Sequence, residues 1–197
     1  MNSTALWYLS QGTGVVSLVL YTAVMLLGIA VVGRGRLPGL PRFGVVALHR
    51  SISLLSLVFL ALHIGTAILD GYVDISVLSA FVPFASAYEP LLIGLGAVAV
   101  DLTIALIVTS LLRDRIGPRL WRAVHWLAYA FWPIAIAHSI GLGSGRGELM
   151  NGWQLWLTIA CVLAVLGALA WRISVERARS RRTPAQVLHT TRSQVRA

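Results

Sequence analysis

Four histidines lie inside two long apolar stretches of the chain, and theirs is the most informative chemistry in the sequence. His49 and His63 are fourteen residues apart in one stretch, and His125 and His138 are thirteen residues apart in the other. An imidazole in hydrocarbon needs a partner, and its ring nitrogen is a good ligand for heme iron. At about 1.5 Å per residue, each pair spans about 20 Å of helix, most of a bilayer core of roughly 30 Å.

Matched depths in the membrane would pair these residues across two helices. If the helices stand parallel, His49 faces His125 at one depth and His63 faces His138 at the other. Each pair then offers two imidazoles to one iron. The sequence therefore predicts two stacked heme sites, each with two axial histidines.

The two histidine helices differ in how their ligands are spaced around the axis. On an ideal helix His63 lies only about 40° from His49, and Ser56 falls between them on the same face, where a small side chain leaves room for flat macrocycles. The thirteen-residue spacing instead places His138 about 140° from the direction of His125. Pro133 lies between them. We predict that it bends the helix and re-aims His138.

Phe131 and Trp132 also fall between the second pair of histidines. Their rings would either fill the gap that separates the hemes or pack against neighbouring helices and lipid, and the sequence leaves both readings open.

Composition predicts an all-α membrane protein. Of 197 residues, 57% are hydrophobic and 12% are charged, unlike a soluble domain. Apolar stretches long enough to cross a bilayer predict a five-span helix bundle: 13–33, 44–69, 91–112, 120–141 and 153–173. The apolar run Val73–Ser86 is short and contains Pro83, so we expect an outer loop folded against the bundle. Trp7 and Tyr8 predict an interfacial lead-in over residues 1–12.

The arginines predict the orientation of the bundle. They cluster in the connections after the first and third spans and beyond the fifth span, whereas only Arg146 falls on the opposite side. The positive-inside rule then places the N-terminus outside and the C-terminus in the cytoplasm. The formal charge of +9 is thus a signal of topology and not of nucleic-acid binding.

Beyond the membrane domain, residues 1–173, we expect a basic cytoplasmic tail, residues 174–197, broken by Pro184 and lying near anionic headgroups. His189 belongs to this tail and receives no role. The single cysteine, Cys161, lies within the fifth span, where a packing role is expected.

Several charged residues lie near the histidines. Arg50 and Arg122 are candidates to pair with the propionates of the inner heme, and interfacial snorkelling is the alternative for both. Arg146 could meet an outer propionate or an anionic acceptor, although a solvated loop arginine is the simpler interpretation. Asp101, near the middle of the third span, should be protonated or paired. It would either take part in proton movement or form a hydrogen bond to a neighbouring helix through Thr103 or another hydroxyl.

Two glycine-rich segments invite different interpretations. The run Gly141–Gly147 follows a membrane helix and has no preceding strand, so we expect a flexible outer turn and no dinucleotide site. Gly94 and Gly96 in the third span more plausibly permit close approach of a neighbouring helix or a macrocycle.

The two histidine segments resemble the heme helices of the ferric reductase-like transmembrane domain. The resemblance rests on LHRSISLLSLVFLALH, residues 48–63, and LWRAVHWLAYAFWPIAIAHSI, residues 120–140, with their Trp-Arg-x-x-His opening, histidine spacings and aromatic-proline segment. It covers roughly residues 6–173. The family includes NADPH oxidases, ferric reductases and the heme-binding membrane subunit of a periplasmic methionine sulfoxide reductase.

The resemblance implies two heme b groups, with His49 paired with His125 and His63 with His138, and electron transfer across a bacterial inner membrane. It implies an oxidoreductase membrane subunit among membrane lipid, with an outer acceptor. Many members carry six spans and continue into flavin and nicotinamide domains. Since only about 24 residues follow the last expected span, we expect the chain to need quinol, a flavoprotein or a separate reductase as donor, with any flavin on a partner.

Four alternatives belong beside this interpretation. The chain could be the quinol-fed partner of a periplasmic reductase of the methionine sulfoxide type, or a quinone-handling diheme cytochrome b. A metal transporter is disfavoured, because imidazoles about 20 Å apart along each helix cannot close one metal site. A purely structural membrane protein would leave the four histidines at matched depths unexplained.

Overall fold

The computed structural model describes residues 3–32, 41–70, 75–143 and 152–194, and most of these residues are helical. The helices are α1 (Ser3–Val32), α2 (Arg42–Leu69), α3 (Val77–Phe81), α4 (Pro90–Leu111), α5 (Arg113–His125), α6 (Ala128–Leu142) and α7 (Gly152–Gln194). The described part of the chain contains no strand, so the expected all-α class is observed.

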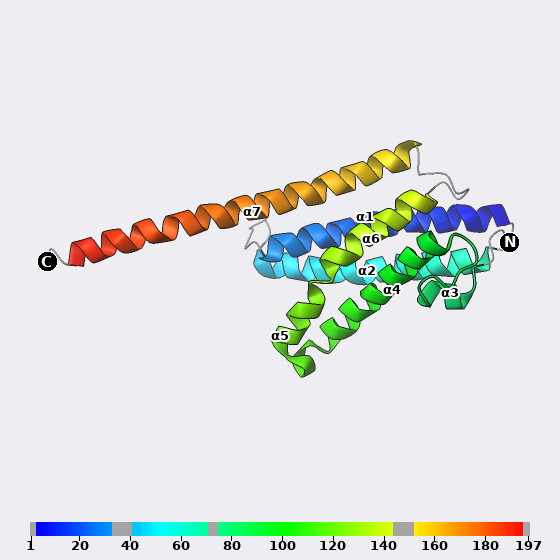
Figure 1. Ribbon diagram of the computed structural model, residues 1–197, viewed down its shortest axis with the longest axis horizontal. Helices are drawn as coiled ribbons and strands as arrows, with labels where there is room; N and C mark the ends of the chain where they lie inside the picture. Colours follow the sequence, from blue (N-terminus) through cyan, green and yellow to red (C-terminus); the bar gives the residue numbers. More distant parts are fainter. Residues whose placement is uncertain (1–2, 33–40, 71–74, 144–151, 195–197) are drawn as a thin grey trace.

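The helices form a bundle in which α1 is the central element (Figure 1). It packs along the whole of α2, and it also contacts α6 and α7. α4 packs against α6, α5 and the short α3. The arrangement places α2 and α6, which carry three of the four membrane histidines, close to the shared neighbour α1.

Four helices are long and apolar enough to cross a membrane: Ala5–Val31, Arg42–Leu69, Pro90–Leu111 and Gly152–Ala178. The chain is therefore a multi-pass membrane protein. The fourth expected span, residues 120–141, is divided between α5 and α6, of which the apolar part Ala128–Leu142 is too short to meet the same length criterion.

The division of this span falls at Trp126 and Leu127, ahead of Pro133, which lies inside α6. Three hydrogen bonds here join residues three apart: Leu127 N–H to Val124, Tyr129 N–H to Trp126 and Ala130 N–H to Leu127, at 2.9, 3.1 and 3.0 Å. The turn preceding the proline is therefore tightened into 3₁₀ geometry. The segment is therefore interrupted at Trp126 and Leu127, and Pro133, where we expected a bend, lies inside α6.

Pro133 weakens the first turn of α6, which follows the tightened turn. Pro133 has no N–H to donate to the carbonyl of Tyr129, and its ring crowds that carbonyl, so the turn before it loses a regular helical bond. Each residue of a 3₁₀ turn rotates by about 120° instead of about 100°. The extra rotation turns His138 toward the face that carries His125.

The buried core lies between α1, α4, α6 and α7. It contains aliphatic side chains around two aromatic rings: Leu18, Met25, Ile29, Ala99, Phe131, Trp132, Ile136, Cys161 and Val165. Cys161 is 7% exposed and packs in this core. α7 is also held by Arg172, which donates to the hydroxyl of Tyr129 at 2.8 Å and pairs with Glu176 at 3.2 Å.

Two boundaries differ from the sequence expectations, and a third segment agrees with them. α1 begins at Ser3, so Trp7 and Tyr8 already lie in the helix and not in a lead-in. The segment 73–86 contains the five-residue α3, capped at its start by the Ser76 side chain and packed against α4, as expected for a segment too short to cross. α7 runs to Gln194 and extends beyond the bundle (Figure 1), so the expected break at Pro184 is wrong.

Candidate heme sites

The fold brings the four histidines together as two pairs. The ring centres of His49 and His125 are 6.4 Å apart with their planes at 65°, and those of His63 and His138 are 6.3 Å apart with their planes at 83°. One member of each pair comes from α2 and the other from the α5–α6 segment. The partners are those expected from matched depth.

The separation within each pair fits two imidazoles on opposite sides of one iron. A metal–nitrogen bond of about 2.0 Å on each side, plus roughly 1.1 Å from each nitrogen to its ring centre, gives about 6.2 Å between ring centres. The large interplanar angles are compatible with this arrangement, because each ring can rotate about its own metal–nitrogen bond. The residues present therefore fit two axial ligand pairs.

Three of the four imidazoles are oriented by a backbone carbonyl of a neighbouring helix. Nδ1 of His49 lies 3.1 Å from the carbonyl oxygen of Val24, Nδ1 of His63 lies 2.8 Å from that of Ser10, and Nδ1 of His138 lies 2.8 Å from that of Leu92. A carbonyl oxygen only accepts, so Nδ1 carries the proton in each case. Nε2 is then the unprotonated nitrogen that can bind a metal, and the Nδ1 bond fixes the ring's direction.

Glycines let two of these rings approach the helix that holds them. A Cβ added at Gly96 would stand 2.7 Å from Cε1 of His138, and one added at Gly14 would stand 3.0 Å from Cε1 and Nδ1 of His63. Gly28 lies under His49 more loosely, at 3.5 Å from Cε1. The expectation that Gly96 permits a close approach is confirmed, although its neighbour is the histidine ring. Gly94 lies against Phe84.

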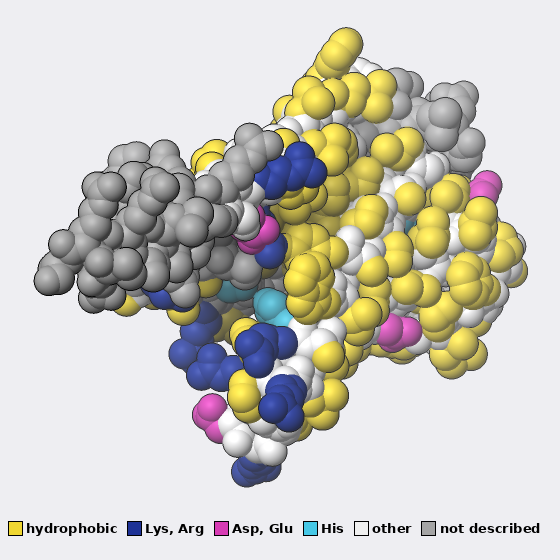
Figure 2. Space-filling model, turned by 60° about the vertical axis from the view of Figure 1, so that its left-hand side comes forward, with side chains coloured by type: hydrophobic (Ala, Val, Ile, Leu, Met, Phe, Trp, Pro, Cys, Tyr) yellow, Lys and Arg dark blue, Asp and Glu magenta, His cyan; other side chains and the backbone are white. Residues whose placement is uncertain are grey.

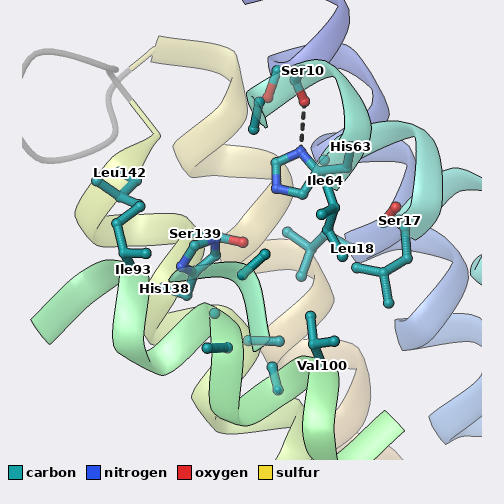
Figure 3. Close-up of a pocket in the computed structure, with 18 of the residues that line it drawn as sticks. Ser10, Ser17, Leu18, His63, Ile64, Ile93, Val100, His138, Ser139 and Leu142 are labelled. Atoms are coloured by element: carbon teal, nitrogen blue, oxygen red, sulfur yellow. Dashed lines mark hydrogen bonds between the residues drawn. The ribbon is translucent and has the colours of Figure 1, made fainter. Parts of the chain in front are cut away.

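A cavity of about 230 Å³ opens between His63 and His138 (Figure 3). Its wall is mostly apolar and includes Leu18 and Val100, and Phe131 and Trp132 line it as well. These two rings are 6% and 7% exposed, and Trp132 Nε1 donates to the hydroxyl of Thr22 at 3.1 Å. The packing interpretation is therefore confirmed, and both rings also border the cavity.

Two polar atoms around the sites have no hydrogen-bond partner among the residues that the structure describes. One is Oγ of Ser17, a cavity-lining side chain that is 5% exposed. The other is Nδ1 of His125. The ring of His125 instead stacks on Trp121, with ring centres 5.0 Å apart and planes at 27°.

The predicted propionate partners lie at exposed positions next to the His49–His125 pair in the sequence. Arg50 is exposed, and Arg122, also exposed, donates from Nε to the carbonyl of Pro118 at 3.0 Å. Figure 2 shows arginine side chains gathered around visible histidine side chains on this part of the surface. Arg146 lies outside the described residues.

Asp101 is not brought to either histidine pair. It is exposed on the surface of α4, and it does not line the cavity. The hydroxyl of Thr103, the neighbour named beside Asp101, donates to the carbonyl of Ala99 on its own helix at 2.8 Å.

Sequence reasoning missed the supporting residues on α1, α4 and α5. Gly14 and Gly28 have the same fourteen-residue spacing as the histidines that they face, and this repeat could have been noticed. The stacking of Trp121 on His125 follows from their i, i+4 spacing on α5. The carbonyl partners carry no signal in the sequence, because every residue has a carbonyl.

Comparison with known proteins identifies the family of the chain. The family model described as ferric reductase like transmembrane component matches residues 13–136, a range that contains His49, His63 and His125 and ends two residues before His138. No curated protein and no solved structure matches the chain significantly. With well over half of its length matched by the family model, the chain belongs to the ferric reductase-like transmembrane family.

Proposed function

We propose that this protein carries electrons across the membrane through two heme b groups, one held by His49 and His125 and the other by His63 and His138. The observation that carries the proposal is the pair of histidine ring separations, 6.4 and 6.3 Å, each of which fits two axial imidazoles on one iron. Membership of the ferric reductase-like family supports the same class of activity.

The chain would supply orientation and exclusion of water, and heme iron would supply a one-electron couple between its ferric and ferrous states. Carbonyls of Ser10, Val24 and Leu92 hold three imidazoles with Nε2 free. The mostly apolar cavity wall at His63 and His138 limits access of water to that pair. Phe131 and Trp132 are buried and lie between His125 and His138 in the sequence, so their rings would border the path of an electron.

We further propose that α5 and α6 together form the remaining crossing, the fourth along the chain. From Pro118, where α5 resumes after Gly117 at φ 79°, to Leu142 there are 25 residues. At about 1.5 Å per residue they would reach about 37 Å, enough to cross a hydrocarbon core. The odd number of crossings would leave the N-terminus outside and the C-terminus in the cytoplasm, with His49 and His125 on the cytoplasmic side.

The electron donor would act at the arginine-rich end. Arg113, Arg115 and Arg119 are exposed on α5, close in sequence to His125. A positive surface at this end suits an anionic donor, such as a flavin phosphate or an acidic protein surface, and a quinol in the membrane is a second source. The acceptor would bind at the opposite end, near His63 and His138.

Heme content tests the proposal directly. The purified chain should contain two b-type hemes per polypeptide, both low-spin, measured by the pyridine hemochrome assay against protein concentration. One heme or none would contradict it.

Electron transfer is tested in sealed vesicles that contain the purified protein and trapped ferricyanide. Dithionite added outside should reduce the trapped ferricyanide quickly only when the protein is present. Empty vesicles and vesicles with a His63→Ala variant are the controls. Equal rates for the wild type and this variant would overturn the proposed route.

A further inference from the structure

Three of the four histidines are held by the same arrangement of a backbone carbonyl and a glycine on a neighbouring helix. The carbonyl that accepts from Nδ1 belongs to Ser10, Val24 or Leu92, and in each case a glycine follows four residues later. These glycines, Gly14, Gly28 and Gly96, lie under the same three rings. On α1 this arrangement of a carbonyl and a glycine is repeated after fourteen residues, which matches the spacing of His49 and His63 on α2.

The fourth histidine, His125, lacks this arrangement of a carbonyl and a glycine. Thirteen residues beyond Leu92 and Gly96 on α4, the spacing of His125 from His138, stand Ala105 and Thr109. The hydroxyl of Thr109 donates to the carbonyl of Ala105 at 2.6 Å, and the hydroxyl of Ser110 donates to the next carbonyl, Leu106, at 2.7 Å. A threonine side chain therefore occupies the place that a glycine has at the other three positions.

Trp121 supplies the contact that orients His125 instead. Its ring stacks on the imidazole, and its Nε1 donates to the hydroxyl of Ser110 at 3.3 Å. The guanidinium of Arg113 lies 5.8 Å from the centre of the same indole ring, on the other end of α5. The orientation of His125 thus depends on an aromatic side chain that is itself anchored to α4.

We propose that Trp121, anchored by Ser110, is the positioning residue for His125, and that His125 is consequently the most easily released of the four axial ligands. This inference rests on the proposed function, since it concerns how a heme ligand is held. An imidazole whose Nδ1–H donates to a carbonyl is fixed in direction and is the more basic ligand. His125 has neither property among the described residues, because its Nδ1 is buried without a partner.

Carbon monoxide is a suitable probe, because it binds to ferrous heme only where an axial ligand has left. In the reduced wild type, the small fraction of heme that binds carbon monoxide should belong to the His49–His125 site. His125→Ala and His138→Ala, which each open one site, provide the reference spectra. These spectra identify the inner heme, at His49 and His125, and the outer heme, at His63 and His138.

Removal of the stacked ring should make His125 easier to release. Trp121→Leu should raise the fraction of inner heme that binds carbon monoxide about fivefold, the change expected for losing one aromatic stacking contact. Its low-spin electron paramagnetic resonance signal should shift because the imidazole plane is free to turn. Trp121→Phe keeps a ring and should restore most of the wild-type behaviour, while Ser110→Ala should give a smaller change in the direction of Trp121→Leu.

Trp126→Leu is the matched control, because this exposed tryptophan is adjacent to His125 in the sequence but its ring packs against Tyr129. It should behave as the wild type. Equal spectra for Trp121→Leu and Trp126→Leu, or a change confined to the outer heme, would overturn the inference.

Two further outcomes keep this inference separate from the proposed function. If Trp121→Leu loses only its inner heme, the positioning role of Trp121 is supported. If Trp121→Leu loses both hemes, carbon monoxide binding is measured in Ser110→Ala instead. Wild-type carbon monoxide binding in Ser110→Ala would then overturn the positioning role. A wild type without two hemes would instead contradict the proposed function itself.

Discussion

The imidazole of His138 lies directly against Gly96, so that a Cβ added at residue 96 would stand 2.7 Å from Cε1 and 2.8 Å from Nδ1. The carbonyl of Leu92, which lies on α4 like Gly96, accepts a hydrogen bond from the same ring. The imidazole is therefore held close to α4, and a methyl group at residue 96 must displace it.

Gly96→Ala should consequently lose the outer heme, and the heme content should fall from about two to about one per chain, since each pair supplies the two axial ligands of one iron. Gly28→Ala is the matched control, because its Cβ would stand 3.5 Å from Cε1 of His49, an ordinary contact. It should keep both hemes. Pyridine hemochrome assays on the two purified variants make the comparison, and equal heme loss in both would show that the ring contacts do not control ligation.

A second prediction concerns the hydrogen bond that joins α1 and α6 in the core. Trp132 donates to Thr22, whose hydroxyl in turn donates to the carbonyl of Leu18 at 2.8 Å. Thr22→Val leaves a buried indole N–H without its acceptor, so it should lower the free energy of unfolding by about 1 kcal/mol. Thermal unfolding in detergent measures the change, with Thr66→Val as a control, since the hydroxyl of Thr66 bonds only to carbonyls of its own helix. Equal losses of stability in the two variants would contradict the role of the interhelical bond.

The third prediction concerns Asp101. Because it is exposed on α4 and does not line the cavity, Asp101→Asn should keep both hemes and leave their reduction potentials within about 10 mV of the wild type, since no charge beside either histidine pair is altered. Redox titration followed by visible spectroscopy provides the measurement. A larger shift of either potential would show that Asp101 is coupled to electron transfer, the alternative that its position near mid-span first raised.

Much of the site could be predicted from the sequence, because the number of residues between two positions on a helix fixes the distance between them along its axis. Fourteen and thirteen residues set the depths of the two pairs, and these depths alone predicted which rings lie together in the structure. Hydropathy likewise identified the four long membrane helices. These features depend on local geometry and not on how the helices pack.

The features that sequence did not predict depend on packing. The sequence predicted one continuous span over 120–141 with a bend at Pro133, and it did not predict the break between α5 and α6 at Trp126 and Leu127, because where the chain tightens depends on neighbouring contacts. α1 is apolar on every side, and for this reason periodicity does not reveal that Gly14 and Gly28 face α2. The continuation of α7 past Pro184 was also missed, because a proline reduces helix stability without always ending a helix.

The last prediction tests the pairing of the four ligands. Ring contacts join His49 with His125 and His63 with His138 across the bundle. Removing either member of a pair leaves one iron with a single protein ligand. His49→Ala and His125→Ala should therefore lose or alter the same heme, with matching visible spectra and redox titrations, while His63→Ala and His138→Ala should alter the other. Partial unfolding would affect both hemes, so the comparison uses only preparations in which the second heme keeps its wild-type potential. If His49→Ala instead matched His138→Ala, the pairs observed in the structure would not be the pairs that bind iron, and the route from the arginine-rich end to the opposite end would have to be abandoned.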